Sequence, residues 1–178
     1  LAYLLWTEFS LVKKLVGYNV PEFKEPEIVV PDGGKLDFLD IPEGFKIAVV
    51  VKGLENPRVV SFDPKGRMLV SETKAGQVSI LEDKDKSGDF EAKTTLIENL
   101  RLPHGIDFYQ DEKSGITYLY IAETHRVARY PYDTNSGRLT SNTGEDIATL
   151  PPDGQHFTRT ILFGPNFREK PILGVATI

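Results

Sequence analysis

One histidine stands where acid–base chemistry could take place. The chain has three histidines, and His156 lies in the stretch DGQHFTRTILFGPN, residues 153–166, in a glycine-containing loop just ahead of an apolar run. An imidazole with an unperturbed pKa of about 6.5 is largely neutral at pH 7 and can accept a proton. Two interpretations remain open: a general base, or a loop histidine bonded to a neighbouring carbonyl.

Two arginines and a second histidine recur at equivalent places. Arg58, His104 and Arg159 each stand four residues before a phenylalanine of an apolar run. If these runs are equivalent strands, the three side chains form a ring around one axis, which is a candidate binding site. Glu72 and Glu123, each followed by threonine, are expected on the same face. Alternatively, Arg58 and Glu72 pair within one unit, and such exposed pairs contribute only about 0–1 kcal/mol.

The elements that must position these residues read as short β-strands. Runs rich in Val, Ile, Tyr and Phe alternate with turn signals, which is typical of an all-β domain. The expected strands are FKIAVVV (45–51), RVVSF (58–62), RMLVSE (67–72), QVSIL (77–81), GIDF (105–108), TYLYIAE (117–123), RVARYPY (126–132) and TRTILF (158–163).

The strands also repeat along the chain. Residues 56–81 align with residues 102–132, and a third copy begins near residue 156, with Phe62, Phe108 and Phe163 spaced 46 and 55 residues apart. Units of roughly 40–50 residues with about four strands each are typical of propeller blades. We therefore expect an all-β fold with about two and a half to three blades of a β-propeller. A β-sandwich would not require this register.

The N-terminal residues follow a different pattern. Residues 1–20 combine an apolar start with helical spacing, which fits either a short helix packed on the body or the remnant of a truncated signal or anchor segment. Residues 21–40 are Pro-rich and acidic, which is typical of a linker. The propeller domain is expected over residues 41–178.

Composition excludes several kinds of chemistry. The absence of cysteine excludes disulfides, thiolate catalysis and Cys-based metal sites. The net charge of −5, without a Lys/Arg cluster, argues against a nucleic-acid partner. The stretch DKDKSGD, residues 83–89, begins like a calcium-binding EF-hand loop, but the twelfth position is Thr94, where a bidentate Glu belongs. We interpret it as a polar hairpin loop and expect no metal site in this chain.

Three stretches resemble a known family. They are NPRVVSFDPKGRMLVSE, LPHGIDF with LYIAETHRVARYPY and, most specifically, TLPPDGQHFTRTILFGPN. They resemble the β-propeller dehydrogenases that use pyrroloquinoline quinone (PQQ), a group that includes soluble glucose dehydrogenase, sorbosone dehydrogenase-like proteins and fungal pyranose dehydrogenases. The resemblance covers about residues 40–166.

The resemblance implies a site at one mouth of a six-bladed propeller, with the quinone over the channel and a sugar above it. It implies that His156 is the general base for the sugar's anomeric hydroxyl, while hydride passes to the quinone. Arg58 matches a position at which relatives similar to the fungal enzymes carry an arginine near the quinone. His104 and Arg159 are expected to face the substrate, whereas His125 falls in a surface turn.

The resemblance also implies cofactors, partners and a location. PQQ and calcium are the expected cofactors, and the quinone-clamping basic residues and the calcium site belong mainly to later blades, beyond Ile178. The chain by itself is therefore expected to be inactive. A sugar substrate and an external quinone or cytochrome acceptor are the expected partners. The expected location is periplasmic or extracellular, with an N-terminal membrane anchor as one option.

A non-redox function also fits the repeat pattern. A calcium-dependent sugar lactonase or a carbohydrate- or protein-binding scaffold uses a similar six-bladed propeller. His156 together with TRTILFGPN favours the dehydrogenase.

Overall fold

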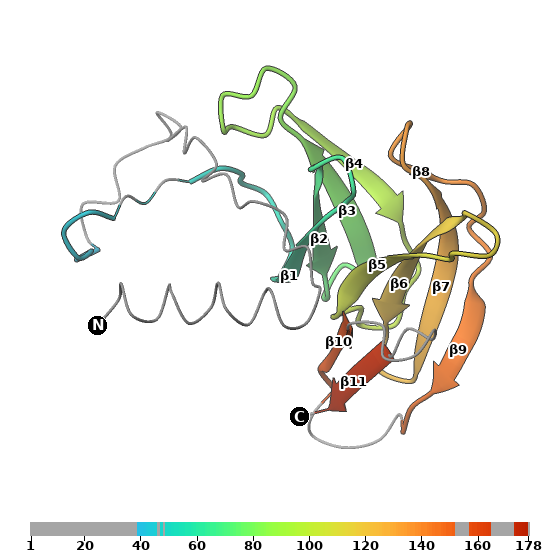
Figure 1. Ribbon diagram of the computed structural model, residues 1–178. Coiled ribbons are helices and arrows are strands. Elements are labelled where there is room, and N and C mark those ends of the chain that lie inside the picture. The colour runs from blue at the N-terminus through green and yellow to red at the C-terminus, as the bar shows by residue number, and fades with distance from the viewer. Residues whose placement is uncertain (1–38, 46, 48, 152–156, 165–172, 178) are drawn as a thin grey trace, which may run out of the picture.

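The described part of the chain is built from short antiparallel strands. The structure is a computed structural model, and it describes residues 39–45, 47, 49–151, 157–164 and 173–177. All regular structure in these ranges is β (Figure 1). No helix among these residues is long and apolar enough to cross a bilayer. Residues 1–38, for which we expected a helix or signal remnant and most of a linker, lie outside the described ranges.

The first sheet is a four-stranded antiparallel blade. Its strands follow chain order, so that each pairs with the next. They are β1 (Pro57–Phe62), β2 (Met68–Glu72), β3 (Gln77–Glu82) and β4 (Ala92–Ile97). The turn from β1 to β2 is closed by Asp63, whose Oδ1 accepts the amides of Lys65 and Arg67 at 2.9 Å, while Gly66 takes a φ of +82°. Glycine adopts this left-handed conformation without steric cost.

The second sheet repeats this arrangement with a split outer edge. Strands β5, β6 and β7 pair in order, and both β8 and β9 pair with β7. Their bounds are β5 (Ile106–Gln110), β6 (Thr117–Ala122), β7 (Arg126–Asp133), β8 (Arg138–Leu139) and β9 (Glu145–Thr149). The third sheet contains β10 (Arg159–Phe163) and β11 (Leu173–Thr177). Two blades and the start of a third confirm the predicted fold.

One expected strand is wrong. Residues 45, 47 and 49–51 of the run FKIAVVV do not belong to a strand. In this segment the amide of Phe90 donates to the carbonyl of Val50 at 3.3 Å, and no ladder with a neighbouring strand forms among the described residues. Apolar residues alone do not make a strand, because a strand also needs a hydrogen-bonded ladder with a neighbour.

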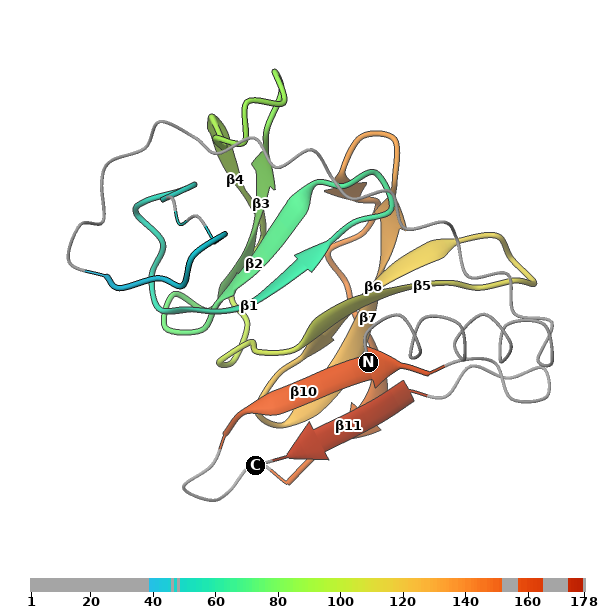
Figure 2. The ribbon, with the colours of Figure 1, turned by 60° about the vertical axis from the view of Figure 1, so that its left-hand side comes forward.

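Two apolar cores lie between successive blades, one between the first and second sheets and one between the second and third. Figure 2 shows the three sheets side by side. Ile106 and Phe108 of β5 point toward the first blade, and Ile161 and Phe163 of β10 point toward the second. This two-residue alternation places one face of each strand in each neighbouring core. The equivalent residues of β1, Val60 and Phe62, are 54% and 55% exposed.

A buried polar cluster at the edge of the first apolar core joins the first two blades. The hydroxyl of Tyr132 donates to Asp63 Oδ2 at 2.7 Å, and Arg67 forms a salt bridge with the same oxygen at 2.6 Å. Arg67 also donates to the carbonyl of Thr134 at 2.5 Å. Burial raises the pKa of the Asp63 carboxyl, but the hydrogen bonds outweigh burial and hold the pKa below its usual value.

Candidate functional site

Two loops bring predicted site residues to the inner strands. The first entrance loop, residues 55–58, includes the first two residues of β1 and carries Arg58. The second, residues 101–104, leads toward β5 and carries His104. Both loops contain a left-handed residue followed by proline: Asn56 has a φ of 52° and Leu102 a φ of 49°. Asparagine tolerates this conformation, whereas a leucine there is strained.

Glu72, at the end of β2, holds the first entrance loop. Its side chain is fully buried, and its Oε2 accepts the amide of Glu55 at 2.6 Å. The other donors to the carboxylate are Ser79 Oγ at 2.5 Å, Gln77 Nε2 at 2.8 Å and Lys93 Nζ at 2.9 Å. Burial raises the pKa of Glu72, but these donors outweigh burial and lower the pKa to about 2. The ion pair is with Lys93, so the proposed pairing of Arg58 with Glu72 is wrong.

Glu123 holds the second entrance loop in the same way. It directly follows β6, its side chain is 2% exposed, and its Oε2 accepts the amide of Arg101 at 2.6 Å. Its Oε1 accepts Arg126 Nε at 2.7 Å, and Arg126 also pairs with Asp146 on β9 at 2.7 Å. Glu72 and Glu123 thus lie at equivalent blade ends, as the repeat predicts, but they bind the main chain.

A threonine hydroxyl links the first blade to the second entrance loop. Thr73 Oγ1 donates to the carbonyl of Pro103 at 2.7 Å, and both residues are buried. The equivalent hydroxyl of Thr124 is also buried and has no hydrogen-bond partner among the described residues. The second entrance loop is therefore held by its own blade through Glu123 and by the preceding blade through Thr73.

His104 is half-buried at the end of the second entrance loop. The carbonyl of Arg159 lies beside its imidazole as a hydrogen-bond acceptor, and its Nδ1 is buried without a partner in the described part of the chain. Burial lowers the pKa of His104, the bond to the Arg159 carbonyl raises it, and the charge of Arg58 lowers it; the net shift is downward. A neutral imidazole with a free Nδ1 can accept a hydrogen bond.

Arg58 and Arg159 occupy equivalent positions with opposite exposure. Arg58 is exposed, and its Nε donates to Asn56 Oδ1 at 3.2 Å. Arg159 is 3% exposed, and its guanidinium donates to main-chain carbonyls. These carbonyls belong to Thr124 at 3.2 Å, Thr158 at 3.0 Å and Pro151 at 2.9 Å. Of the three residues at equivalent repeat positions, Arg58 and His104 interact electrostatically. The side chain of Arg159 instead donates to main-chain carbonyls of the surrounding loops.

The other histidines are placed differently. His125 lies in the turn before β7, as expected, and its Nδ1 is buried without a described partner. His156, the residue we expect to be the general base, falls within 152–156, outside the described residues. Its position relative to His104 therefore stays a prediction.

The loop after β3 gathers three carboxylates. Oxygens of Asp83, Asp85 and Glu91 lie within 4.8 Å of one another, a spacing that could hold a metal ion. Amides from within the loop already donate to them: Ser87 and Gly88 to Asp83, and Lys84 to Glu91. In this loop Glu91, at the ninth position, supplies the third carboxylate, whereas Thr94 stands at the twelfth. A shorter loop between two strands is the signal that would have found Glu91.

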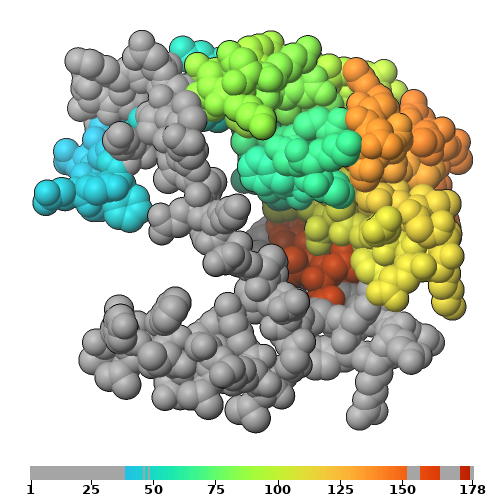
Figure 3. All heavy atoms as spheres, turned by 45° about the horizontal axis from the view of Figure 1, so that its top comes forward, coloured from blue at the N-terminus to red at the C-terminus, as the bar shows by residue number. Residues whose placement is uncertain are grey.

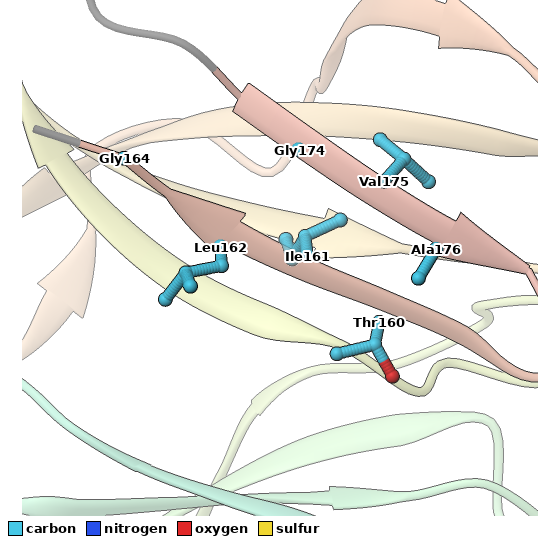
Figure 4. Close-up of a pocket in the computed structure, with 7 residues that line it drawn as sticks. All are labelled: Thr160, Ile161, Leu162, Gly164, Gly174, Val175 and Ala176. Atoms are coloured by element: carbon cyan, nitrogen blue, oxygen red, sulfur yellow. The ribbon is translucent and has the colours of Figure 1, made fainter.

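An apolar hollow on the third blade lies apart from these groups. Leu162 of β10 is 68% exposed on the face that points away from the second blade (Figure 4). The residues that line the hollow are Thr160, Ile161, Leu162, Gly164, Gly174, Val175 and Ala176. None of these residues is ionisable, so the hollow itself offers no group for acid–base chemistry. In Figure 3 the first blade (green) abuts the second (yellow to orange).

The strand order, the blade repeat and the two entrance loops define a class of protein, a β-propeller assembled from equivalent units. A family model described as TrAA12-like matches residues 39–175. The chain belongs to this family.

Relatives of this chain are named as quinone-dependent dehydrogenases. It is 26% identical over 123 residues to a pyrroloquinoline quinone-dependent pyranose dehydrogenase from Coprinopsis cinerea, covering 69% of this chain and 16% of that protein. It is 29% identical over 123 residues to a pyrroloquinoline quinone-dependent sugar dehydrogenase from Hypocrea jecorina, covering 67% of this chain and 27% of that protein.

Solved structures agree with this assignment. The holo form of the PQQ domain of the Coprinopsis cinerea pyranose dehydrogenase aligns with a TM-score of 0.57 at 26% identity, covering 69% of this chain and 28% of that one. A calcium structure of the Trichoderma reesei family AA12 enzyme aligns with a TM-score of 0.58 at 28% identity, covering 68% and 29%. The chain thus spans less than a third of the length of these relatives.

Proposed function

We propose that this chain supplies two blades and the start of a third to a PQQ-dependent sugar dehydrogenase. The observation that carries the proposal is the position of Arg58 and His104 at the same end of the inner strands, near enough for the charge of Arg58 to lower the pKa of His104. An exposed cation thus lies within electrostatic reach of an imidazole whose Nδ1 has no described partner. The family assignment and the named relatives support the same conclusion.

The residues at this end fit a carboxylate-bearing quinone. The guanidinium of Arg58 is exposed and partly oriented by Asn56, so it can form a charge-assisted pair with a carboxylate. PQQ, when bound, supplies the redox chemistry by accepting hydride from the sugar. Calcium is proposed as the second cofactor. Glu72 and Glu123 already accept several donors, so we expect other residues to hold the ion.

The other ring residues take separate roles in this proposal. His104 contacts the sugar through its imidazole, and the lowered pKa of His104 favours the neutral form there. His156 accepts the proton of the sugar hydroxyl as general base. Arg159 is not proposed to bind substrate, because its buried guanidinium donates to main-chain carbonyls. Its role here is to hold the start of β10.

The same reaction guides our proposals for an electron acceptor and for the location of the protein. The electrons taken from a sugar must pass to an external acceptor, for which a quinone or a cytochrome is proposed. A periplasmic or extracellular location, with a membrane anchor at the N-terminal end as one option, would bring the enzyme to free sugars.

Dye reduction in a closed propeller tests the proposal. Residues 39–175 would replace the matching residues of the Coprinopsis cinerea enzyme, and dye reduction would be followed with aldoses in the presence of PQQ and calcium. We expect sugar-dependent reduction that disappears without PQQ. A folded chimera that neither binds PQQ nor reduces the dye would overturn the proposal, and hydrolysis of sugar lactones by it would favour the lactonase alternative.

Two variants assign the roles. Arg58→Ala should weaken PQQ binding, measured by quinone fluorescence, while the matched control Arg138→Ala, an exposed arginine on the outer strand β8, should not. His156→Ala should lower turnover by roughly 10²–10⁴-fold with PQQ affinity kept. An unchanged turnover would remove His156 from the role of base.

A further inference from the structure

Each of the two buried glutamates at the end of a second strand accepts a main-chain amide from the loop that leads into the same blade. We propose that Glu123 is a positioning residue for His104, acting through the amide of Arg101 to fix the second entrance loop. The part of this inference that concerns substrate rests on the proposed function. The part that concerns the position of the imidazole can be tested without cofactor or sugar.

The two oxygens of Glu123 connect the loop to the sheet. Oε2 accepts the Arg101 amide at 2.6 Å, and Oε1 accepts Arg126 Nε at 2.7 Å on β7. Arg126 is fixed in turn by Asp146 on β9 at 2.7 Å. The carbonyl of Arg101 also accepts the amide of Thr124 at 3.2 Å. Both sides of Arg101 are therefore tied to the end of the blade.

The backbone between Arg101 and His104 transmits this restraint. Leu102 adopts a left-handed φ of 49°, which a leucine does not hold without surrounding contacts. The ring of Pro103 fixes its own φ, and its carbonyl accepts Thr73 Oγ1 at 2.7 Å. The amide of His104 donates to the carbonyl of Ala122 at 2.9 Å. Movement at Arg101 would therefore reach the imidazole within three residues.

The first blade repeats the device, which argues against coincidence. Glu72 accepts the amide of Glu55 at 2.6 Å, three residues before Arg58, as Glu123 accepts the amide three residues before His104. The loop sequences, ENPR and RLPH, share only the proline. A buried glutamate that accepts the amide three residues before the end residue is thus common to both blades.

An NMR titration of His104 in the 178-residue chain tests the inference, with its signal assigned through His104→Gln. In Glu123→Ala the loop loses its acceptor, the imidazole becomes more exposed, and its pKa should rise toward the ordinary value. Loss of the glutamate charge alone would lower the pKa instead, so the sign separates positioning from charge. Glu123→Gln keeps an oxygen acceptor for the Arg101 amide, so the pKa of His104 should not rise. Glu82→Ala removes a partly exposed carboxylate at the end of β3 and leaves both loops in place, so it should not raise the pKa either.

A second variant covers the case in which Glu123→Ala does not fold. Thr73→Val removes the donor to Pro103 on the same loop without changing charge, and the His104 pKa should rise. Thr124→Val, which removes a hydroxyl with no described partner, is its control. Equal titration of His104 in wild type and a folded Glu123→Ala, or in both threonine variants, would overturn the inference.

Activity provides a separate readout. In an active chimera, Glu123→Ala should lower kcat/KM for the sugar by about 10–100-fold with PQQ affinity kept, because a small displacement of a binding group is costly. Rescue by Glu123→Gln should accompany it. If the chimera is inactive but His104 shifts as expected, positioning stands and the proposed function fails. If the chimera is active but His104 does not shift, the positioning role fails alone.

Discussion

The two entrance loops present their end residues from similar backbones, but different interactions maintain them. In the first loop, asparagine occupies the left-handed position, and Glu72 has donors from β3 and β4 besides the loop amide. In the second, a leucine occupies that position, and Glu123 accepts Arg126 besides the loop amide. Thr73 of the preceding blade adds a contact there. The first loop therefore depends on its own blade, and the second depends also on its neighbour.

Removing Glu72 should produce the largest effect on this comparison. Glu72→Ala leaves Ser79 and the amide of Glu55 without their acceptor. Lys93 is 31% exposed and keeps the carbonyl of Gly53, so the loss should be about 2–4 kcal/mol, mainly from the buried donors. Urea unfolding would measure this loss. Glu82→Ala, which removes a partly exposed carboxylate 4.0 Å from Lys84, should cost less than about 1 kcal/mol. Equal costs in the two variants would show that burial of Glu72 adds nothing.

Acid should sharpen the same point. The pKa of Glu72 in the folded chain is about 2, below its ordinary 4.5, so its stabilisation is fully present above pH 4.5 and is lost as the pH falls toward 2. This corresponds to roughly 3 kcal/mol. The difference in unfolding free energy between wild type and Glu72→Gln should therefore shrink over this window. A difference that stays constant from pH 6 to about 2.5 would contradict the lowered pKa.

The contact from the neighbouring blade should have an intermediate effect. Thr73→Val leaves the buried carbonyl of Pro103 without its donor, which costs about 1–2 kcal/mol. Thr124→Val removes a hydroxyl with no partner among the described residues and should change stability by less than about 0.5 kcal/mol. Thermal unfolding of the pair would measure the difference. Similar losses would mean that the Thr73 bond does not hold the second loop.

Exchanging the left-handed residues should produce the smallest effects, with opposite signs. Leu102→Asn relieves strain and should stabilise the chain by about 0.5–1 kcal/mol, while Asn56→Leu should destabilise it by a similar amount. Chemical unfolding of both single variants and the double variant would measure the changes. Destabilisation by both would show that side-chain contacts of Leu102 outweigh its backbone strain.

Alternation and repeat spacing predicted most of the strands, because each blade strand packs one face on each neighbour. Four strands were not predicted. They are β4 (AKTTLI), the two-residue β8, β9 (EDIAT) and β11 (LGVAT). The position of Glu72 and Glu123 at blade ends followed from the repeat. Their function did not, because each binds a main-chain amide 17 or 22 residues away that any sequence would provide.

The burial of Arg159 was equally hard to foresee. Its sequence position matches that of Arg58, which is exposed. The difference arises because carbonyls of Thr124 and Pro151 converge on its guanidinium and satisfy it in the interior. Phe62 illustrates the reverse: it matches Phe108 in the repeat, but lacks a preceding blade among the described residues and is 55% exposed. The position in the repeat therefore predicts which way a side chain points, whereas the neighbouring blade determines whether that side chain is buried.

Through the carbonyl of Arg159, the pKa of His104 depends on the spacing between the second and third blades. This carbonyl accepts the amide of Gly105 at 2.8 Å and also the imidazole of His104. A Cβ at position 105 would lie 2.6 Å from this oxygen, so only glycine lets the inner strands approach so closely. Gly105→Ala would wedge the third blade outward and stretch both bonds. The proton affinity of His104 would then change with the angle between the second and third blades, so a titration of this histidine would report how the blades are packed.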